Sequence, residues 1–345
     1  MRDYSSFRAI SGPNVWRTAD YAGSGEWIHR LTPAALADIE RAMRAVERRG
    51  LTLDDVGPET FDLPALAEDL CEIKRILGEG RGFVLIKGID AEKYSETELG
   101  IITYGLGTHI GTVVSQSYRG DRLGHVIDRG ETNRYYTRGG EIEFHMDPVD
   151  VVGLFCLRPS PEGGESWIAS SMAIHNAILE EHPEYMEPLY RGYYYRSERL
   201  ANDDGRNTEH QLPVYAPAGG EMTCFYLPNA VRRAYADGLA QWTPVERSAF
   251  KAVDDYANRL DLRLKMDFAP GDIQFLNNRT VLHARSDYRD HDDPRLKRHL
   301  FRVWMMVPGW APRPASMQMR KDTDRDGGGI PRRPELADPK AVDPY

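Results

Sequence analysis

Apolar residues recur at a helical period through much of the first third of the chain. Thr32 is an N-cap residue followed by Pro33 in the first turn, and the apolar positions after it predict a helix that stops at Gly50. Ser95 and Glu98 have the spacing of a capping box, which predicts a later helix. The predicted elements are helices over 31–49, 63–77 and 95–106 and a strand between glycines over 82–88.

After about residue 110 the pattern changes to short apolar runs separated by Gly, Pro, Asn and Asp, which is typical of β-strands. Two helices interrupt these runs, a short one from about Ser171 and a longer one from Thr243-Pro244 to about Leu260. Many short strands with inserted helices favour a sandwich or barrel, so we expect a mainly β chain with helical additions, an α+β protein. The predicted strands cover 149–157, 192–195, 223–227, 272–276, 280–283 and 301–307.

Two segments lack a regular pattern. Residues 197–220 are polar and rich in turn formers, which fits either a mobile lid over a pocket or a long surface loop. Residues 311–345 are rich in Pro, Arg, Asp and Gly and are predicted to form an irregular C-terminal tail. The chain has no internal repeat, so we expect residues 1–310 to form a single domain with a helical N-terminal part over 30–110.

Composition narrows the class of protein. Of the 345 residues 41% are apolar, and the formal net charge of −9 comes without a recurring basic stripe, so no nucleic-acid partner is expected. Cys71, Cys156 and Cys224 form no C-x-x-C pair, which indicates a reducing, cytoplasmic setting. The longest apolar run, residues 151–157, is too short to cross a bilayer, so no membrane partner is expected. These features predict a soluble protein that acts on small molecules, and they leave a homo-oligomer open.

His-x-acid pairs are the first candidates for chemistry. The ten His and 53 acidic residues predict about 1.5 such pairs by chance, and the chain contains three. His182-Pro183-Glu184 ends a polar helix at a proline, and His291-Asp292-Asp293 lies in a dense run of charges, so we expect neither to be a site. The third pair, His145-Met146-Asp147, is the strongest candidate because it directly precedes an apolar strand.

His145 and Asp147 follow residues 141–144, which alternate at the period of a strand. Residues i and i+2 of a strand point to the same side, so the pair would place two polar groups together on a buried sheet. Burial is costly for such groups unless they have partners. The pair is therefore either two ligands of a metal ion or a hydrogen-bonded His–Asp pair of the core.

A second histidine, His283, favours the metal hypothesis. It ends a short apolar strand that follows two turns, and it lies 138 residues after His145. Two histidines and one carboxylate on one face are the usual ligands of redox-active non-haem iron, with open positions for a co-substrate and O2. Arg298 and Arg302 flank the start of the last apolar strand, where an arginine could hold a carboxylate in a bidentate manner or form a surface salt bridge.

Taken together, these motifs resemble the TauD/TfdA group of clavaminate-synthase-like 2-oxoglutarate oxygenases. The resemblance covers roughly residues 82–308, and the order and spacing of the motifs are more specific than any motif alone. The motifs are His145-Met146-Asp147, Gly163-Gly164-Glu165-Ser166, Pro270-Gly271-Asp272, the segment 278–285 and Arg298-His299-Leu300-Phe301-Arg302.

The resemblance implies a double-stranded β-helix, or jelly roll, over about 82–308. It implies that Fe(II) is held by His145, Asp147 and His283 and that Arg298 pairs with the distal carboxylate of 2-oxoglutarate. Ser166 stands where the family often has a hydroxyl that binds the same carboxylate, although it could equally be an ordinary turn serine. The implied activity couples oxidative decarboxylation of 2-oxoglutarate by O2 to hydroxylation or desaturation of a small organic or amino acid.

Residues that contact the primary substrate are harder to predict. Glu141 and Glu143 share the strand parity of His145 and would favour a cationic group on the substrate, unless they only support the strand. Arg302 falls where family members contact the substrate or support the co-substrate. Segments that the family folds near the substrate contain further candidates, namely Gln116, Tyr118, Tyr136 and Arg138.

Two other functions fit parts of the pattern. A cupin-like metal enzyme would need the metal ligands but neither Arg298 nor Ser166. A non-catalytic jelly-roll binding module would use His145 and Asp147 only as structural residues. A zinc hydrolase is disfavoured because the chain has no H-E-x-x-H motif and no catalytic serine elbow.

Overall fold

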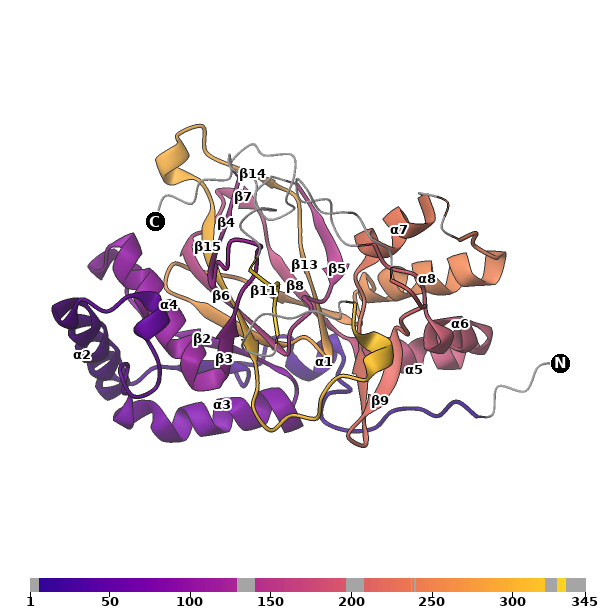
Figure 1. The fold of residues 1–345 in the computed structure, drawn as a ribbon, viewed down its shortest axis with the longest axis horizontal. Coiled ribbons are helices and arrows are strands. Elements are labelled where there is room, and N and C mark those ends of the chain that lie inside the picture. The colour runs from indigo at the N-terminus through magenta and orange to yellow at the C-terminus, as the bar shows by residue number, and fades with distance from the viewer. Residues whose placement is uncertain are drawn as a thin grey trace.

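The computed structural model describes residues 6–128, 140–196, 208–236, 238, 240–319 and 328–332. Two β-sheets lie in the centre, with helices α2, α3 and α4 on one side and α5 to α8 on the other (Figure 1). The protein is therefore a mixed α+β chain, as the sequence pattern predicted. None of the helices in the described ranges is both long and apolar enough to cross a bilayer.

The N-terminal helices form where capping residues predicted them. The Thr32 side chain accepts a hydrogen bond from the backbone of Ala35, and α2 ends at Gly50, whose φ of 62° is left-handed. Ser95 and Glu98 form a reciprocal capping box at the start of α4. These predictions are confirmed, with small shifts at the ends. The elements are α2 (Pro33–Arg49), α3 (Ala67–Glu79), α4 (Glu96–Ile110) and the strand β2 (Phe83–Lys87).

The larger sheet joins strands that are far apart in the sequence. Its order is β1-β2-β12-β6-β15-β3, and β4 also pairs with β15. Only the β1–β2 pair is parallel. Besides β2, the strands are β1 (Ile28–Arg30), β3 (Thr112–Val114), β4 (Leu123–Ile127), β6 (Val151–Arg158), β12 (Ile273–Asn277) and β15 (His299–Met306).

The smaller sheet is antiparallel, in the order β11-β8-β13-β5. Its strands are β5 (Ile142–His145), β8 (Ser166–Ser170), β11 (Arg263–Met266) and β13 (Val281–Arg285). Two further antiparallel pairs form separate two-stranded sheets, the hairpin β9 (Tyr215–Ala218) with β10 (Glu221–Cys224) and the long-range pair β7 (Glu162–Gly163) with β14 (Tyr288–Arg289). The C-terminal helices are α5 (Ser171–Glu181), α6 (Met186–Arg191), α7 (Pro228–Ala236) and α8 (Pro244–Ala257).

Alternation along β15 separates a helix-covered face from an inner face. Phe301, Val303 and Met305 pack in the cluster that contains the buried residues of α2, α3 and α4. Trp304 instead packs with Ile168 and other residues of the smaller sheet. Because side chains alternate along a strand, Arg302 shares the inner side with Trp304. The inner faces of the two sheets thus enclose the space in which the polar motif residues meet.

Two predicted strands differ from the structure. The run 192–195 forms only an isolated bridge between Tyr193 and Leu212, because Tyr193 and Tyr195 are buried in an aromatic cluster around the C-terminal helices instead of lying in a sheet. The run predicted over 223–227 is shifted, since β10 ends at Cys224. In both cases an apolar run was interpreted as a strand, whereas its residues outside the observed strand are buried by tertiary packing instead of strand pairing.

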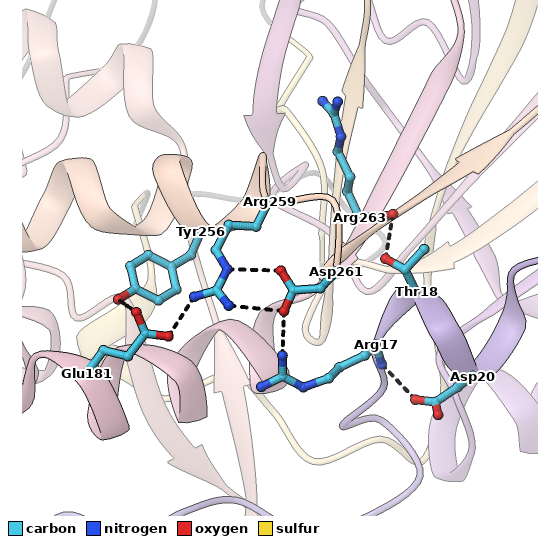
Figure 2. A network of polar contacts seen from close by, with 8 residues as sticks. All are labelled: Arg17, Thr18, Asp20, Glu181, Tyr256, Arg259, Asp261 and Arg263. Atoms are coloured by element: carbon cyan, nitrogen blue, oxygen red, sulfur yellow. Dashed lines mark hydrogen bonds and ion pairs between the residues drawn. The ribbon is translucent and has the colours of Figure 1, made fainter.

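An ionic network ties the N-terminal α1 (Thr18–Tyr21) to the turn between α8 and β11 (Figure 2). Arg259 contacts both Asp261, with Nε to Oδ1 at 3.0 Å, and Glu181, with Nη1 to Oε1 at 2.6 Å. Arg17 Nη1 contacts the other oxygen of Asp261 at 2.6 Å. These side chains are partly exposed, so each pair contributes at most about 1 kcal/mol and mainly fixes the path of the chain.

The lid prediction falls partly on residues 197–207, which lie outside the described residues. The described remainder of that segment contains the Leu212 bridge and β9. Within the described part of the tail, 311–319 and 328–332, the only helical turn is the 3-10 turn Ala315–Met317. Arg313 is partly buried, and its Nη2 donates to the carbonyl oxygens of Val149 at 2.9 Å and Asn278 at 3.0 Å.

Candidate active site

Three residues on or next to two neighbouring strands of the smaller sheet meet at one point. His145 ends β5 and lies opposite His283 of β13 in the antiparallel register, with ring centroids 4.3 Å apart. Asp147 follows two residues later and is buried, with its Oδ2 3.8 Å from His283 Nε2. One ligand-type atom from each of the three residues lies within 4.8 Å of the others. The structure therefore brings together the group that the sequence singled out.

Both imidazoles can offer a lone pair. His145 Nδ1 lies 2.8 Å from the carbonyl oxygen of Glu143, which can only accept, so Nδ1 carries the proton and Nε2 is left as the electron-pair donor. Burial, with the nearby His145, lowers the pKa of His283 to about 3, so this ring is neutral at neutral pH. Neutral imidazole is the form that binds a metal ion.

Asp147 is held as a carboxylate. Burial alone would raise the pKa of Asp147, but the charge of Arg302, whose Nη1 is 3.6 Å from Oδ1, and the two histidines outweigh it and hold the pKa below its usual value. Trp304 Nε1 also donates to Asp147 Oδ2 at 3.0 Å. Two imidazoles and one ionised carboxylate, held by two neighbouring strands, are a donor set that fits Fe(II).

Arg298 is a buried cation that lies over the Tyr288 ring, 5.5 Å from its centroid, and has no ion-pair partner in the described part of the chain. Its Nη2 donates weakly to the carbonyl oxygen of Gly164 at 3.4 Å, while its Nη1 is buried and has no hydrogen-bond partner among the described residues. Burial lowers the pKa of Arg298 to about 10, which still leaves it charged at neutral pH. An unpaired buried guanidinium is costly, so this group fits an anionic ligand such as a carboxylate of 2-oxoglutarate.

The glycine pair of the G-G-E-S motif lets the chain turn closely around Arg298. Gly163 and Gly164 both have left-handed backbones, with φ of 74° and 72°. A Cβ on Gly163 would lie 2.2 Å from the Asp287 carbonyl oxygen, and one on Gly164 would lie 3.1 Å from Arg298 Nε. Ser166 follows two residues later as the first residue of β8 and is buried. The motif thus brings the Gly164 backbone against Arg298 two residues before the buried serine.

Gln116 and Arg302 form a reciprocal pair next to Asp147. Arg302 Nε donates to Gln116 Oε1 at 2.8 Å, and Gln116 Nε2 donates to the Arg302 carbonyl oxygen at 2.8 Å. The Arg302 guanidinium also stacks over Trp304, 4.7 Å from the ring centroid. Tyr118, two residues after Gln116, is also buried. These contacts make Gln116 a support of Arg302.

Among the described residues, the side chains of the remaining substrate candidates form no hydrogen bond or ion pair with the three candidate ligands. Glu141 is exposed, whereas Glu143 forms an ion pair with Arg232 of α7. Burial, with Glu143 close by, raises the pKa of Asp254 on α8. Tyr136 and Arg138 lie outside the described residues.

The two rejected His-x-acid pairs lie at the surface. His182 Nδ1 contacts Glu184 Oε1 at 3.2 Å within its own turn, and Asp293 accepts from the backbone of Arg295. In the described ranges neither pair belongs to a group of three ligand-type residues.

A second group of three, Glu96, His125 and His299, was not predicted from the sequence because its members come from α4, β4 and β15. His125 Nδ1 lies 2.9 Å from His299 Nε2, which is a hydrogen-bond distance. Arg158 Nη2 lies 3.2 Å from His299 Nδ1, and Arg158 Nη1 lies 3.8 Å from Glu96 Oε2. A guanidinium in this position would repel a metal ion, so the group is better described as a hydrogen-bonded network.

The chain is similar in sequence to two proteins over most of its length. The chain is 26% identical over 325 residues to FR-33289 synthase of Streptomyces rubellomurinus, covering 91% of this chain and 95% of that protein. It is 27% identical over 322 residues to the taurine hydroxylase-like protein SAT17 of Stachybotrys chartarum, covering 86% and 81%.

Solved structures show the same fold. Asparagine oxygenase in complex with Fe(II), 2S,3S-3-hydroxyasparagine and succinate matches with a TM-score of 0.67 at 15% identity, covering 82% of this chain and 94% of that one. The non-haem iron oxygenase OrfP with Fe and alpha-ketoglutaric acid matches with a TM-score of 0.60 at 16% identity, covering 81% and 93%. The family model "Taurine catabolism dioxygenase TauD, TfdA family" matches residues 47–304. The chain therefore belongs to the TauD/TfdA family of Fe(II)- and 2-oxoglutarate-dependent dioxygenases.

Proposed function

We propose that this oxygenase holds its iron with His145, Asp147 and His283 and hydroxylates a small organic or amino acid. The observation that carries the proposal is the convergence of two imidazoles and a buried, ionised carboxylate at one point between the sheets. Bound iron, with 2-oxoglutarate and O2, would supply the oxidising power for attack on a C–H bond. We describe the two facing sheets as the halves of a double-stranded β-helix over about residues 82–308, within a single domain that ends near residue 310.

The residues of this chain would do the binding and positioning. Arg298 would hold the distal carboxylate of 2-oxoglutarate through its unpartnered Nη1, and the Ser166 hydroxyl would donate to the same carboxylate. Trp304 and Arg302 would keep Asp147 ionised and fixed in direction. The apolar side chains between the sheets would exclude water from the reacting groups.

An amino-acid substrate is the class we favour. Two of the solved neighbours carry hydroxylated amino acids, 3-hydroxyasparagine in one and 3-hydroxyarginine in the other. In this chain Glu143 and Arg232 would offer one group of each charge on the side of β5 and α7, next to His145. Such a pair could exchange its internal contact for the ammonium and carboxylate groups of a substrate.

The iron assignment is tested by anaerobic addition of Fe(II) and 2-oxoglutarate to the purified protein. We expect a visible charge-transfer band for the unaltered protein, and its loss in His283→Ala. The matched control is His182→Ala, because this surface histidine also belongs to a His-x-acid pair but should leave the band unchanged. A band that persists in His283→Ala would contradict the ligand assignment.

The substrate class is tested by supplying small amino acids and other organic acids together with Fe(II), 2-oxoglutarate and O2. We expect succinate release to rise together with consumption of one amino acid. Equal succinate release with every compound, without consumption of any, would contradict an amino-acid substrate from this set.

A further inference from the structure

Gln274 is a buried polar side chain between two apolar residues, Ile273 and Phe275, on a strand of the larger sheet. It lies on β12, is fully buried, and pairs in register with Leu85 and Leu154. Its side chain reaches across to Ser166 and Met266, which are neighbours in the smaller sheet. An amide buried between two sheets is costly unless its polar atoms are used, so a specific role is expected.

The surroundings fix which way the amide points. Gln274 Nε2 lies against the sulfur of Met266 and 3.4 Å from Ser166 Oγ. A thioether sulfur can only accept a hydrogen bond, so the amide NH2, and not the carbonyl oxygen, faces Met266. Gln274 therefore donates to Ser166, although the bond is long. Its Oε1 is buried and has no hydrogen-bond partner among the residues described.

This direction determines where the Ser166 proton can go. A serine hydroxyl has one proton and can also accept. Because its oxygen accepts from Gln274, the proton is free to be donated to a different group. Arg298 donates to the carbonyl oxygen of Gly164, two residues before Ser166, and its Nη1 has no hydrogen-bond partner in the described chain.

We propose that Gln274 is a positioning residue for the co-substrate. By donating to Ser166 Oγ, it leaves the Ser166 hydroxyl proton for the distal carboxylate of 2-oxoglutarate, which Arg298 would also bind. This inference rests on the proposed function of Ser166 and Arg298. Gln274 does not touch the iron ligands and acts only through Ser166.

The test is isothermal titration of Mn(II)-loaded protein with 2-oxoglutarate and, separately, with 2-oxopentanoate, which has the same chain length but no distal carboxylate. In Gln274→Leu we expect 2-oxoglutarate to bind about three- to tenfold more weakly, as for the loss of one hydrogen bond. Binding of 2-oxopentanoate should not change. Equal weakening of both ligands, or of neither, would overturn the proposal.

A double-mutant cycle separates positioning from simple packing. In a Ser166→Ala background, Gln274→Leu should have no further effect on 2-oxoglutarate binding, whereas independent effects would add. Gln274→Met has a similar shape and serves as a second variant if Gln274→Leu folds poorly. In a Ser166→Thr background, which keeps the hydroxyl, Gln274→Leu should again weaken 2-oxoglutarate binding. Full additivity in the cycle would overturn the proposal. If the unaltered protein fails to bind 2-oxoglutarate at all, the proposed function fails instead.

Discussion

At the residue scale, the site depends on groups that surround Asp147 as much as on the three candidate ligands. Both carboxylate oxygens have a donor or cation close by, Trp304 at 3.0 Å and Arg302 at 3.6 Å. The Asp147 backbone N–H also donates to Asn278 Oδ1 at 3.2 Å. Partners of this kind fix the direction of a ligand and so set metal affinity. The sequence predicted the three candidate ligands and singled out Arg302, but it did not predict Trp304 or Asn278 as supports, because these two residues have no metal-binding signature of their own.

Removing the Trp304 hydrogen bond should weaken metal binding. Trp304→Phe keeps an aromatic ring on the inner face but deletes the Nε1–H that contacts Asp147. We expect the affinity for Mn(II), measured by competition with a chelating dye, to fall about 10- to 100-fold. Trp167→Phe is the control, since Trp167 stacks with Arg263 away from the ligands and should leave affinity unchanged. Equal affinities for the two variants would contradict the supporting role of Trp304.

Arg298 should be sensitive even to a change that preserves its charge. Lysine cannot make the bidentate contact of a guanidinium, so Arg298→Lys should bind the co-substrate carboxylate more weakly. We expect titration of the charge-transfer band to give a dissociation constant for 2-oxoglutarate raised about tenfold or more. Arg295→Lys is the control, because that side chain is exposed and pairs only with its neighbour Asp293. An unchanged constant in Arg298→Lys would count against the assignment.

At the element scale, the sequence was informative where local signals and tertiary packing agree. The capping residues Thr32 and Ser95 marked helices that the structure contains, because a cap acts within one turn of its helix. Gly163 and Gly164 marked a turn that only glycine can make at that close approach. The run at 192–195 was mistaken for a strand, because an apolar run records burial but not the partner against which it is buried. The order of the strands in each sheet has no local sequence signal, so it could not be predicted without the family resemblance.

Close packing between the larger sheet and the N-terminal helices should make Gly153 intolerant of a side chain. Gly153 lies in the middle of β6, and a Cβ there would be 2.7 Å from the Phe275 ring and 2.8 Å from Val303 Cγ2. Gly153→Ala should therefore lower the free energy of unfolding by about 1–3 kcal/mol. Chemical denaturation would measure this loss. Gly25→Ala is the control, because a Cβ at Gly25 meets no atom within 4 Å.

At the scale of the whole molecule, the candidate iron site lies where segments distant in sequence converge. His145 and His283 are held by β5 and β13, while Asp147 is anchored through Asn278 in the turn between β12 and β13. Arg313 of the C-terminal segment binds the carbonyl oxygen of that same Asn278. The core and the start of the tail thus support one site, which the sequence reading did not predict because it assigned the tail no contacts.

A metal ion bound across these segments should stabilise the entire fold. A ligand that binds only the folded state adds about 2.7 kcal/mol when its concentration is 100 times its dissociation constant. We therefore expect Mn(II) to raise the thermal midpoint by several degrees, chelation by EDTA to reverse the rise, and 2-oxoglutarate to add to it only when metal is present. In His283→Ala the metal-dependent rise should disappear, whereas in His182→Ala it should remain. In His283→Ala, an ion held only by His145 and Asp147 would no longer connect their segment to β13. A rise of the same size in both variants would therefore mean that the stabilising ion binds elsewhere.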